Sequence, residues 1–353
     1  MNSGLHSVCR QNTWDVIAFF VTKGLIAGSG VVHVLYNHRP VAKTLRMGQP
    51  ERTHPLIVAQ FLGMGVAWGA SFLFIKVGLE SVSVAQVVLI RDIVGAATLG
   101  VYVLVTRQRF PREPIVWLHF FVLGAVYCVI PYLLFAWAEQ SIASSLASIY
   151  DGSTPIAVAI FAAVVFRIEK LDFEQIVGVA LGVVGVVVIA SPWTSAIGGA
   201  LDGQLACVIA VACYGVSFGY IRRFISSRDI SGSMSAFLNV GMGAVIMLVL
   251  APWIASQPIH HFSWPSAVSL LVLGGVGTGI AYLWNMNVLR EWSPTASASV
   301  TYLIPVVGVL LGVLILRERL SWNEPIGAAV VLIAILFTQG RIPLRRAAAN
   351  EGA

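Results

Sequence analysis

The residue best suited to do chemistry is Asp151, an acid inside an apolar run long enough to cross a membrane. It lies about nine residues into that run, which is roughly 13 Å deep at 1.5 Å per residue. An ionised carboxylate there costs on the order of 2.5–3.5 kcal/mol, so it must be neutral, paired or next to water. Asp151 could carry a proton, bind a cationic substrate group, or pair with Arg91, which enters from the same side. These alternatives stay open, and both residues are candidates for coupling.

Two prolines point to a polar face beside Asp151. Pro155 and Pro305 each interrupt a long apolar run, and Thr301 and Ser297 precede Pro305 at steps of four, as Asp151 precedes Pro155. Residues four apart share one helix face, and paired helix breaks are typical of cavities in transporters. The residues expected to line a substrate cavity are Trp68, Ser71, Phe72, Tyr132, Ser148, Asp151, Pro155, Tyr214, Ser217, Tyr282, Asn285, Ser297, Thr301 and Pro305.

The aromatic members of this set suit flat or cationic solutes. Trp68, Tyr214, Tyr132 and Tyr282 fall inside the apolar runs, where their rings could stack on such a solute. Other aromatic residues in the runs are expected to form belts at the membrane interfaces.

Enzyme and metal chemistry find little support in the sequence. Gly215 to Gly219 match the G-x-S-x-G motif, but that motif needs a strand-turn-helix context, and no His lies mid-run to act as a base. His260 and His261 have no further ligands nearby, and no G-x-x-x-x-G-K-[ST] loop is present. We therefore expect no catalytic residue, no metal and no cofactor.

Composition places the chain in the membrane. Hydrophobic residues make up 58% and charged residues 11% of the 353 positions, against about 25% charged residues in soluble domains. Basic residues are scattered, which argues against a nucleic-acid partner. A membrane-spanning helix needs roughly 20 mainly apolar residues. Ten runs qualify, at residues 56–77, 84–105, 115–138, 142–166, 173–191, 203–223, 233–254, 265–289, 294–316 and 322–340.

The chain contains an internal repeat. The sequence at 68–72 lines up with that at 214–218, and Val122-Leu123-Gly124 lines up with Val272-Leu273-Gly274. Glu169 likewise falls on Glu318. Five spans per repeat is an odd number, so the second copy must enter the membrane from the opposite side. The predicted fold is an all-α membrane protein of ten transmembrane helices in two inverted five-helix repeats, at 55–192 and 200–340, with a tail at 341–353.

These segments carry a family resemblance. WGASFLFIKVGL, LIRDIVGA and SSLASIYDGSTPIAVAIFAAVVFRIEKL in the first copy, with SPTASASVTYLIPVVGVLLGVLILRERL in the second, resemble the EamA-type family of the drug/metabolite transporter superfamily. The resemblance covers about residues 56 to 340. It implies ten helices, a central cavity and export of small metabolites. It does not specify a substrate, and Asp151 departs from the family pattern.

Positive charges orient the chain. With a cytoplasmic N-terminus, about 16 Lys and Arg residues lie on the inner side and 4 on the outer side, as the positive-inside rule requires. Both termini are therefore predicted to be cytoplasmic, in the plasma (inner) membrane. Residues 1–54 are expected to form an N-terminal extension, although 14–36 could form an eleventh helix, and Met47 could be the natural start.

The function expected from these features is secondary transport. The chain would export small metabolites, such as amino acids or related amphipathic solutes, by alternating access. Its expected partners are a small-molecule substrate and the lipid bilayer, while a proton gradient and a homodimer stay open. A drug or organic-cation exporter is the alternative of the same class. An intramembrane hydrolase that uses Ser217 and a scaffold that transports nothing are the alternatives of other classes.

Overall fold

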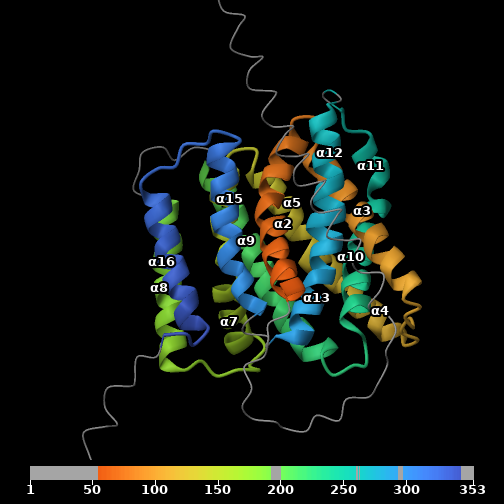
Figure 1. The fold of residues 1–353 in the computed structure, drawn as a ribbon, viewed down its shortest axis with the longest axis horizontal. Coiled ribbons are helices and arrows are strands. Elements are labelled where there is room, and N and C mark those ends of the chain that lie inside the picture. The colour runs from red at the N-terminus through yellow and green to blue at the C-terminus, as the bar shows by residue number, and fades with distance from the viewer. Residues whose placement is uncertain (1–54, 192–199, 260, 262, 293–296, 343–353) are drawn as a thin grey trace, which may run out of the picture.

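The computed structural model describes residues 55–191, 200–259, 261, 263–292 and 297–342, and the secondary structure in these ranges is helical (Figure 1). Its first half contains α2 (Pro55–Leu79), α3 (Val84–Val105), α4 (Pro114–Leu123), η2 (Gly124–Val129), α5 (Ile130–Ala138), α6 (Ser144–Gly152), α7 (Thr154–Val164) and α8 (Phe173–Ala190). Its second half contains α9 (Ala200–Tyr220), η3 (Ile221–Ile225), α10 (Gly232–Val249), α11 (Ala251–Ala255), α12 (Trp264–Val272), η4 (Leu273–Ile280), α13 (Ala281–Glu291), η5 (Ser299–Tyr302), α15 (Leu303–Leu314) and α16 (Asn323–Thr338).

Eight stretches of this chain are long and apolar enough to cross a membrane, which confirms an all-helical, multi-pass membrane protein. Each predicted run overlaps described helix, with end differences of a few residues. The last two runs appear as the shorter apolar helices Ser299–Leu314 and Asn323–Thr338. The possible helix at 14–36 lies outside the described residues.

Several runs are interrupted rather than continuous. The third and eighth runs contain the π-helical segments η2 and η4, and the fourth run breaks at Ser153, just before Pro155. Proline has no backbone N–H and cannot continue the hydrogen-bond ladder of the preceding turn. The ninth run changes from 3₁₀ to α geometry two residues before Pro305. These breaks lie around the centre of the bundle.

The helices pair mainly between the two halves of the chain. The most extensive contact joins α8 to α16 at one edge of the bundle, and α3 packs on α10 toward the other (Figure 1). In the centre, α2 packs against α12, α13 and α15, while α9 packs against α5, α6 and α7. The main contacts named here correspond when each helix is replaced by its counterpart in the other half.

A partly buried charged contact connects helices of the first half at one end of the bundle. The Lys76 ammonium at the end of α2 donates to the backbone oxygen of Glu139 and, at 2.9 Å, to that of Ile142. Lys76 therefore binds the turn between α5 and α6.

The repeat-related acids Glu169 and Glu318 have different partners. Glu318 accepts hydrogen bonds from the backbone N–H groups of Ser144 at 2.7 Å and Ser145 at 2.9 Å, and so caps the N-terminus of α6. Glu169 forms an exposed ion pair with Arg222. Glu169 is thus part of an ion pair, whereas Glu318 joins the two halves through a helix cap.

Candidate functional site

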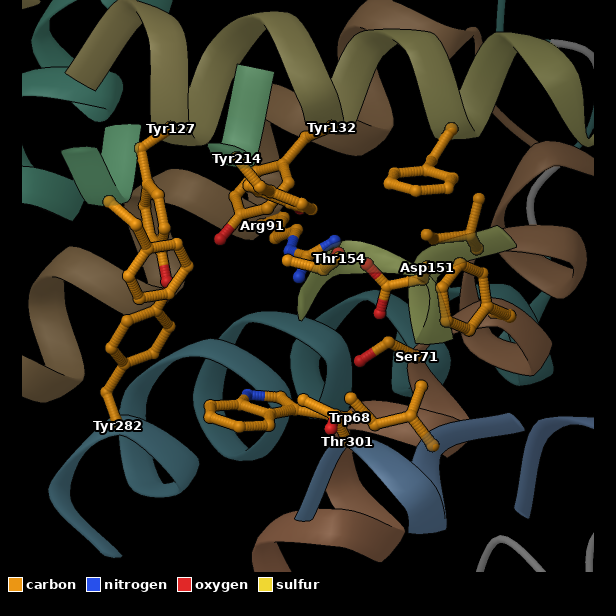
Figure 2. Close-up of a pocket in the computed structure, with 15 residues that line it drawn as sticks. Trp68, Ser71, Arg91, Tyr127, Tyr132, Asp151, Thr154, Tyr214, Tyr282 and Thr301 are labelled. Carbon is orange, nitrogen blue, oxygen red and sulfur yellow. The ribbon is translucent and has the colours of Figure 1, made fainter. Parts of the chain in front are cut away.

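A cavity of about 120 Å³ lies among the central helices (Figure 2). A water molecule needs roughly 10–15 Å³ on this scale, so there is room for several waters or part of a small solute. The cavity is lined by Trp68, Ser71, Phe72, Ile75, Arg91, Tyr127, Tyr132, Phe135, Asp151, Thr154, Tyr214, Phe218, Tyr282, Thr301 and Ile304. These residues come from both halves of the chain.

Arg91 supplies the positive charge of the cavity. Its side chain is 8% exposed and its guanidinium carbon lies 3.6 Å from the centre of the Tyr132 ring. The Nε–H donates to Thr278 Oγ1 at 3.0 Å, which fixes the guanidinium plane from η4. Stacking and one neutral hydrogen bond hold the group in place without neutralising it, which leaves the charge available to an anion.

Asp151 supplies the negative charge. It lies in the last turn of α6, beside the break at Ser153, so the chain turns away and the carboxylate borders the cavity. Figure 2 shows Asp151 and Arg91 at the same cavity. The ion pairs found within the described ranges are Glu169–Arg222 and Glu113–Arg228. The alternative in which Asp151 pairs directly with Arg91 is therefore not realised in this conformation.

Aromatic rings form much of the cavity wall. Trp68 meets Tyr282 edge-on with ring centres 6.0 Å apart, and Tyr127 lies 5.4 Å from Tyr214 and 6.2 Å from Tyr282. Edge-to-face contacts of this kind fix the rings relative to one another. The result is a preformed, mostly apolar pocket with few polar groups, which is typical of small-molecule sites.

The structure brings together most of the cavity residues expected from sequence. Those that line the cavity are Trp68, Ser71, Phe72, Tyr132, Asp151, Tyr214, Tyr282 and Thr301, together with Arg91. Six others lie elsewhere, namely Ser148, Pro155, Ser217, Asn285, Ser297 and Pro305.

Helix packing explains three of these six. Ser148 is fully buried, and a Cβ added at Gly308 would lie 2.3 Å from its Oγ, so it lies in the close contact of α6 with α15. Pro305 packs against Gly152 in the same contact. Ser217 is fully buried and its Oγ donates to the Cys213 backbone oxygen at 2.8 Å, so the hydroxyl does not face the cavity.

The other three, Pro155, Asn285 and Ser297, also do not line the cavity. Ser297 donates to Asn285 Oδ1 at 3.4 Å, so these two polar groups satisfy each other. Pro155 occupies the first turn of α7, where a missing N–H is tolerated. It marks the break that ends α6 at Gly152, and it does not line the cavity.

Six lining residues were not expected from sequence: Ile75, Tyr127, Phe135, Thr154, Phe218 and Ile304. Helical spacing could have found some, because Ile75 follows Phe72 by three and Ser71 by four. Tyr127 lies in η2, where the π-helical turn shifts the direction of each side chain. A regular helical pattern does not predict that shift.

Known proteins similar to this chain are membrane transporters. The chain is 26% identical to the uncharacterized inner membrane transporter YedA of Escherichia coli K12 over 293 residues, which is 81% of this chain and 92% of YedA. It is 22% identical to a probable amino-acid metabolite efflux pump of the same organism, over 80% of this chain and 94% of that protein.

The fold and the family model agree with these relatives. One solved crystal structure matches 81% of this chain and 99% of its own, with a TM-score of 0.58 and 17% identity, which shows a common fold. The model of the EamA-like transporter family matches residues 56–191 and again 201–339. Together these matches cover most of the chain, which therefore belongs to the EamA-like transporter family.

Proposed function

We propose that this membrane transporter exports small zwitterionic metabolites of the amino-acid type from the cell, across the inner membrane. The observation that carries the proposal is the pair of opposite charges, Arg91 and Asp151, which border one aromatic cavity without pairing with each other. The similarity to a probable amino-acid metabolite efflux pump supports the same substrate class.

Charge complementarity gives each end of the substrate a partner. The stacked guanidinium of Arg91 would bind a carboxylate, because Arg presents donors in a fork that matches carboxylate geometry. The Asp151 carboxylate would bind an ammonium group, which also neutralises a charge that is costly within the membrane. The rings of Trp68, Tyr214 and Tyr282 would pack on the substrate side chain.

An organic-cation exporter is the competing function. Asp151 and the aromatic wall would suit a cation. Arg91 argues against it, since a fixed positive charge in the same cavity repels a solute without an anionic group. The two functions therefore differ in whether a substrate carboxylate strengthens or weakens binding.

Alternating access follows from the proposed architecture. We take the eight longer spans with Ser299–Leu314 and Asn323–Thr338 as ten spans in two inverted repeats, about 55–192 and 200–340. The paired contacts between halves support this arrangement, as does the family model's double match. Inverted repeats can exchange conformations, which opens the central site to the other side of the membrane.

Binding to the purified protein in detergent tests the charge argument. Phenylalanine, phenylethylamine and 3-phenylpropionate share a ring and differ only in charge, so they isolate the two charged groups. Phenylalanine should raise the melting temperature most. Loss of one charged hydrogen bond costs about 1.5–3 kcal/mol, so each singly charged analogue should bind roughly 10- to 100-fold more weakly.

Two variants complete the binding test. Arg91→Gln should remove the advantage of phenylalanine over the amine, and Asp151→Asn should remove its advantage over the acid. Glu80→Gln, which changes an exposed acid in the turn after α2, is the matched control. Tighter binding of phenylethylamine than of phenylalanine by the unmodified protein would favour the organic-cation exporter instead.

A further inference from the structure

Asp92 is a second acidic residue within a membrane-spanning helix, and it does not line the cavity. It follows Arg91 on α3 but points about 100° away around the helix. Its side chain is fully buried, and neither carboxylate oxygen has a hydrogen-bond partner within the described part of the chain. Asp151, by contrast, is partly exposed at the cavity.

Asp92 lies where α3, η2 and α10 meet. A Cβ added at Gly243 of α10 would lie 3.1 Å from Asp92 Oδ2 and 3.0 Å from Cys128 Cβ of η2, so the three elements converge there. Asn239 lies one turn before Gly243, and its Oδ1 is also buried without a partner among the described residues. The Cys128 thiol donates to the Asn239 backbone oxygen at 3.9 Å. The contact between α3, η2 and α10 is thus rich in hydrogen-bond acceptors.

Few charges act on Asp92. The titratable groups that interact with it are Arg91 on its own helix, Cys128 on η2 and Tyr132 on α5. Of the other elements packed on α3, α10, α11, α12 and η4 contain no charged residue, and α2 contains Lys76, whose ammonium binds the turn after α5. The Arg91 guanidinium stacks on Tyr132 and donates to Thr278 at the cavity, and no ion pair joins it to Asp92 within the described residues.

A proton bound to Asp92 removes the cost of burying its charge. An ionised carboxylate without hydrogen bonds is strongly disfavoured in the membrane interior, whereas the neutral acid lacks that cost. We propose that Asp92 is the proton-binding site that couples export to a proton gradient. This rests on the proposed function, and it places the coupling proton on Asp92 rather than on Asp151, which is left to bind the substrate.

The position of Asp92 connects the proton to the substrate. α3 carries Arg91 on the cavity side and Asp92 on the side that packs on α10, its counterpart in the other half. Relative movement of the halves would let water reach Asp92. The O–H bond then breaks, the proton passes to water and the carboxylate remains. Reprotonation from water on the other side reverses the step. No oxidant, reductant or co-reactant is needed.

Transport in proteoliposomes tests this assignment. Uptake of labelled phenylalanine is measured together with proton movement, which a pH-sensitive dye reports. The proteins compared are the unmodified protein, Asp92→Asn and the control Glu80→Gln. The unmodified protein and the control should accumulate phenylalanine in vesicles that are acidic inside and release protons in exchange, because export driven by a proton gradient moves protons and substrate in opposite directions. Asp92→Asn should still exchange internal for external phenylalanine, but its gradient-driven accumulation of phenylalanine should be at least tenfold lower. That exchange would show that the proposed function survives the failure of coupling.

Two results would overturn the assignment. One is proton movement per phenylalanine that is unchanged in Asp92→Asn. The other is accumulation driven by a sodium gradient and lost in Asp92→Asn, because the buried acceptors would then serve a sodium ion. If the unmodified protein exchanges neither phenylalanine nor any of a panel of other amino acids, the proposed substrate class fails, and the assignment of the proton rests on a measurement that needs no substrate.

That measurement is the melting temperature in detergent as a function of pH. A carboxyl group that is neutral when folded and ionised when unfolded binds more protons in the folded state, so stability falls as pH rises. Replacement by Asn removes this contribution. The melting temperature of the unmodified protein should therefore fall more steeply between about pH 5 and pH 9 than that of Asp92→Asn. Identical slopes for the two proteins would contradict a proton on Asp92.

Discussion

At the scale of single residues, the central feature is a pair of opposite charges that do not neutralise each other. Arg91 is held by a ring and a hydroxyl, and Asp151 by the end of a helix, so both are fixed before a solute arrives. Preorganised groups of this kind bind with a smaller loss of side-chain freedom. Asp92, next to Arg91, is directed to a different contact and can serve a different purpose.

The lack of a direct ion pair makes a stability prediction. If Arg91 and Asp151 were paired, removal of both charges would restore much of the stability lost on removal of one. Because no ion pair joins them although they border one cavity, the coupling energy between Arg91→Gln and Asp151→Asn should be small, at most about 1 kcal/mol. Chemical denaturation of the two single variants and the double variant measures this. A double variant clearly more stable than the sum predicts would mean that the charges pair.

Gly308 allows α15 to approach α6. An added Cβ would lie 2.3 Å from both Cβ and Oγ of Ser148, which cannot move freely because it is buried in the contact. Gly308→Ala should therefore lower the free energy of unfolding by about 1–3 kcal/mol. Gly241→Ala is the matched control, since nothing lies within 4 Å of its added Cβ. Equal stability of the two variants would rule out a close contact at Gly308.

At the scale of helices, the sequence predicts where apolar segments lie but not how they are interrupted. The run at 84–105 coincides with α3, because Ser83 and Gln86 form a capping box that marks its start. Pro155 signals the break that orients Asp151. The π-helical segments η2 and η4 have no such capping or proline signal in the sequence. The sequence does not predict Tyr127 at the cavity for this reason. Ser148 and Ser217 are expected at the cavity from sequence but lie in helix contacts, because small residues also allow helices to pack closely.

The cap that Glu318 provides to α6 should contribute to stability. Its carboxylate accepts two backbone hydrogen bonds at a helix N-terminus, where a negative charge is favourable. Glu318→Gln keeps the size of the side chain and removes the charge. We expect a loss of about 1–2 kcal/mol in unfolding free energy, measured by denaturation, with Glu80→Gln unchanged. A Glu318→Gln variant as stable as the unmodified protein would show that the cap contributes little.

At the scale of the whole molecule, orientation in the membrane underlies the transport proposal. Reporter fusions at Arg109 and Gly340 should give a cytoplasmic signal, and a fusion at Gly198 should give an outside signal. The loop that contains Gly198 has no Lys or Arg between Ser191 and Gln204, as expected of an outer loop. A cytoplasmic signal at Gly198 would contradict both the inverted repeat and alternating access.

Counterflow in proteoliposomes tests the central claim, that this chain moves zwitterionic metabolites through the cavity bordered by Arg91 and Asp151. Vesicles loaded with unlabelled phenylalanine are diluted into a trace of labelled phenylalanine, without any ion gradient. We expect the unmodified protein to accumulate label transiently. Accumulation should be at least tenfold lower with Arg91→Gln and absent in protein-free vesicles. Label that enters no faster than in protein-free vesicles, for phenylalanine and for a panel of other amino acids, would contradict it.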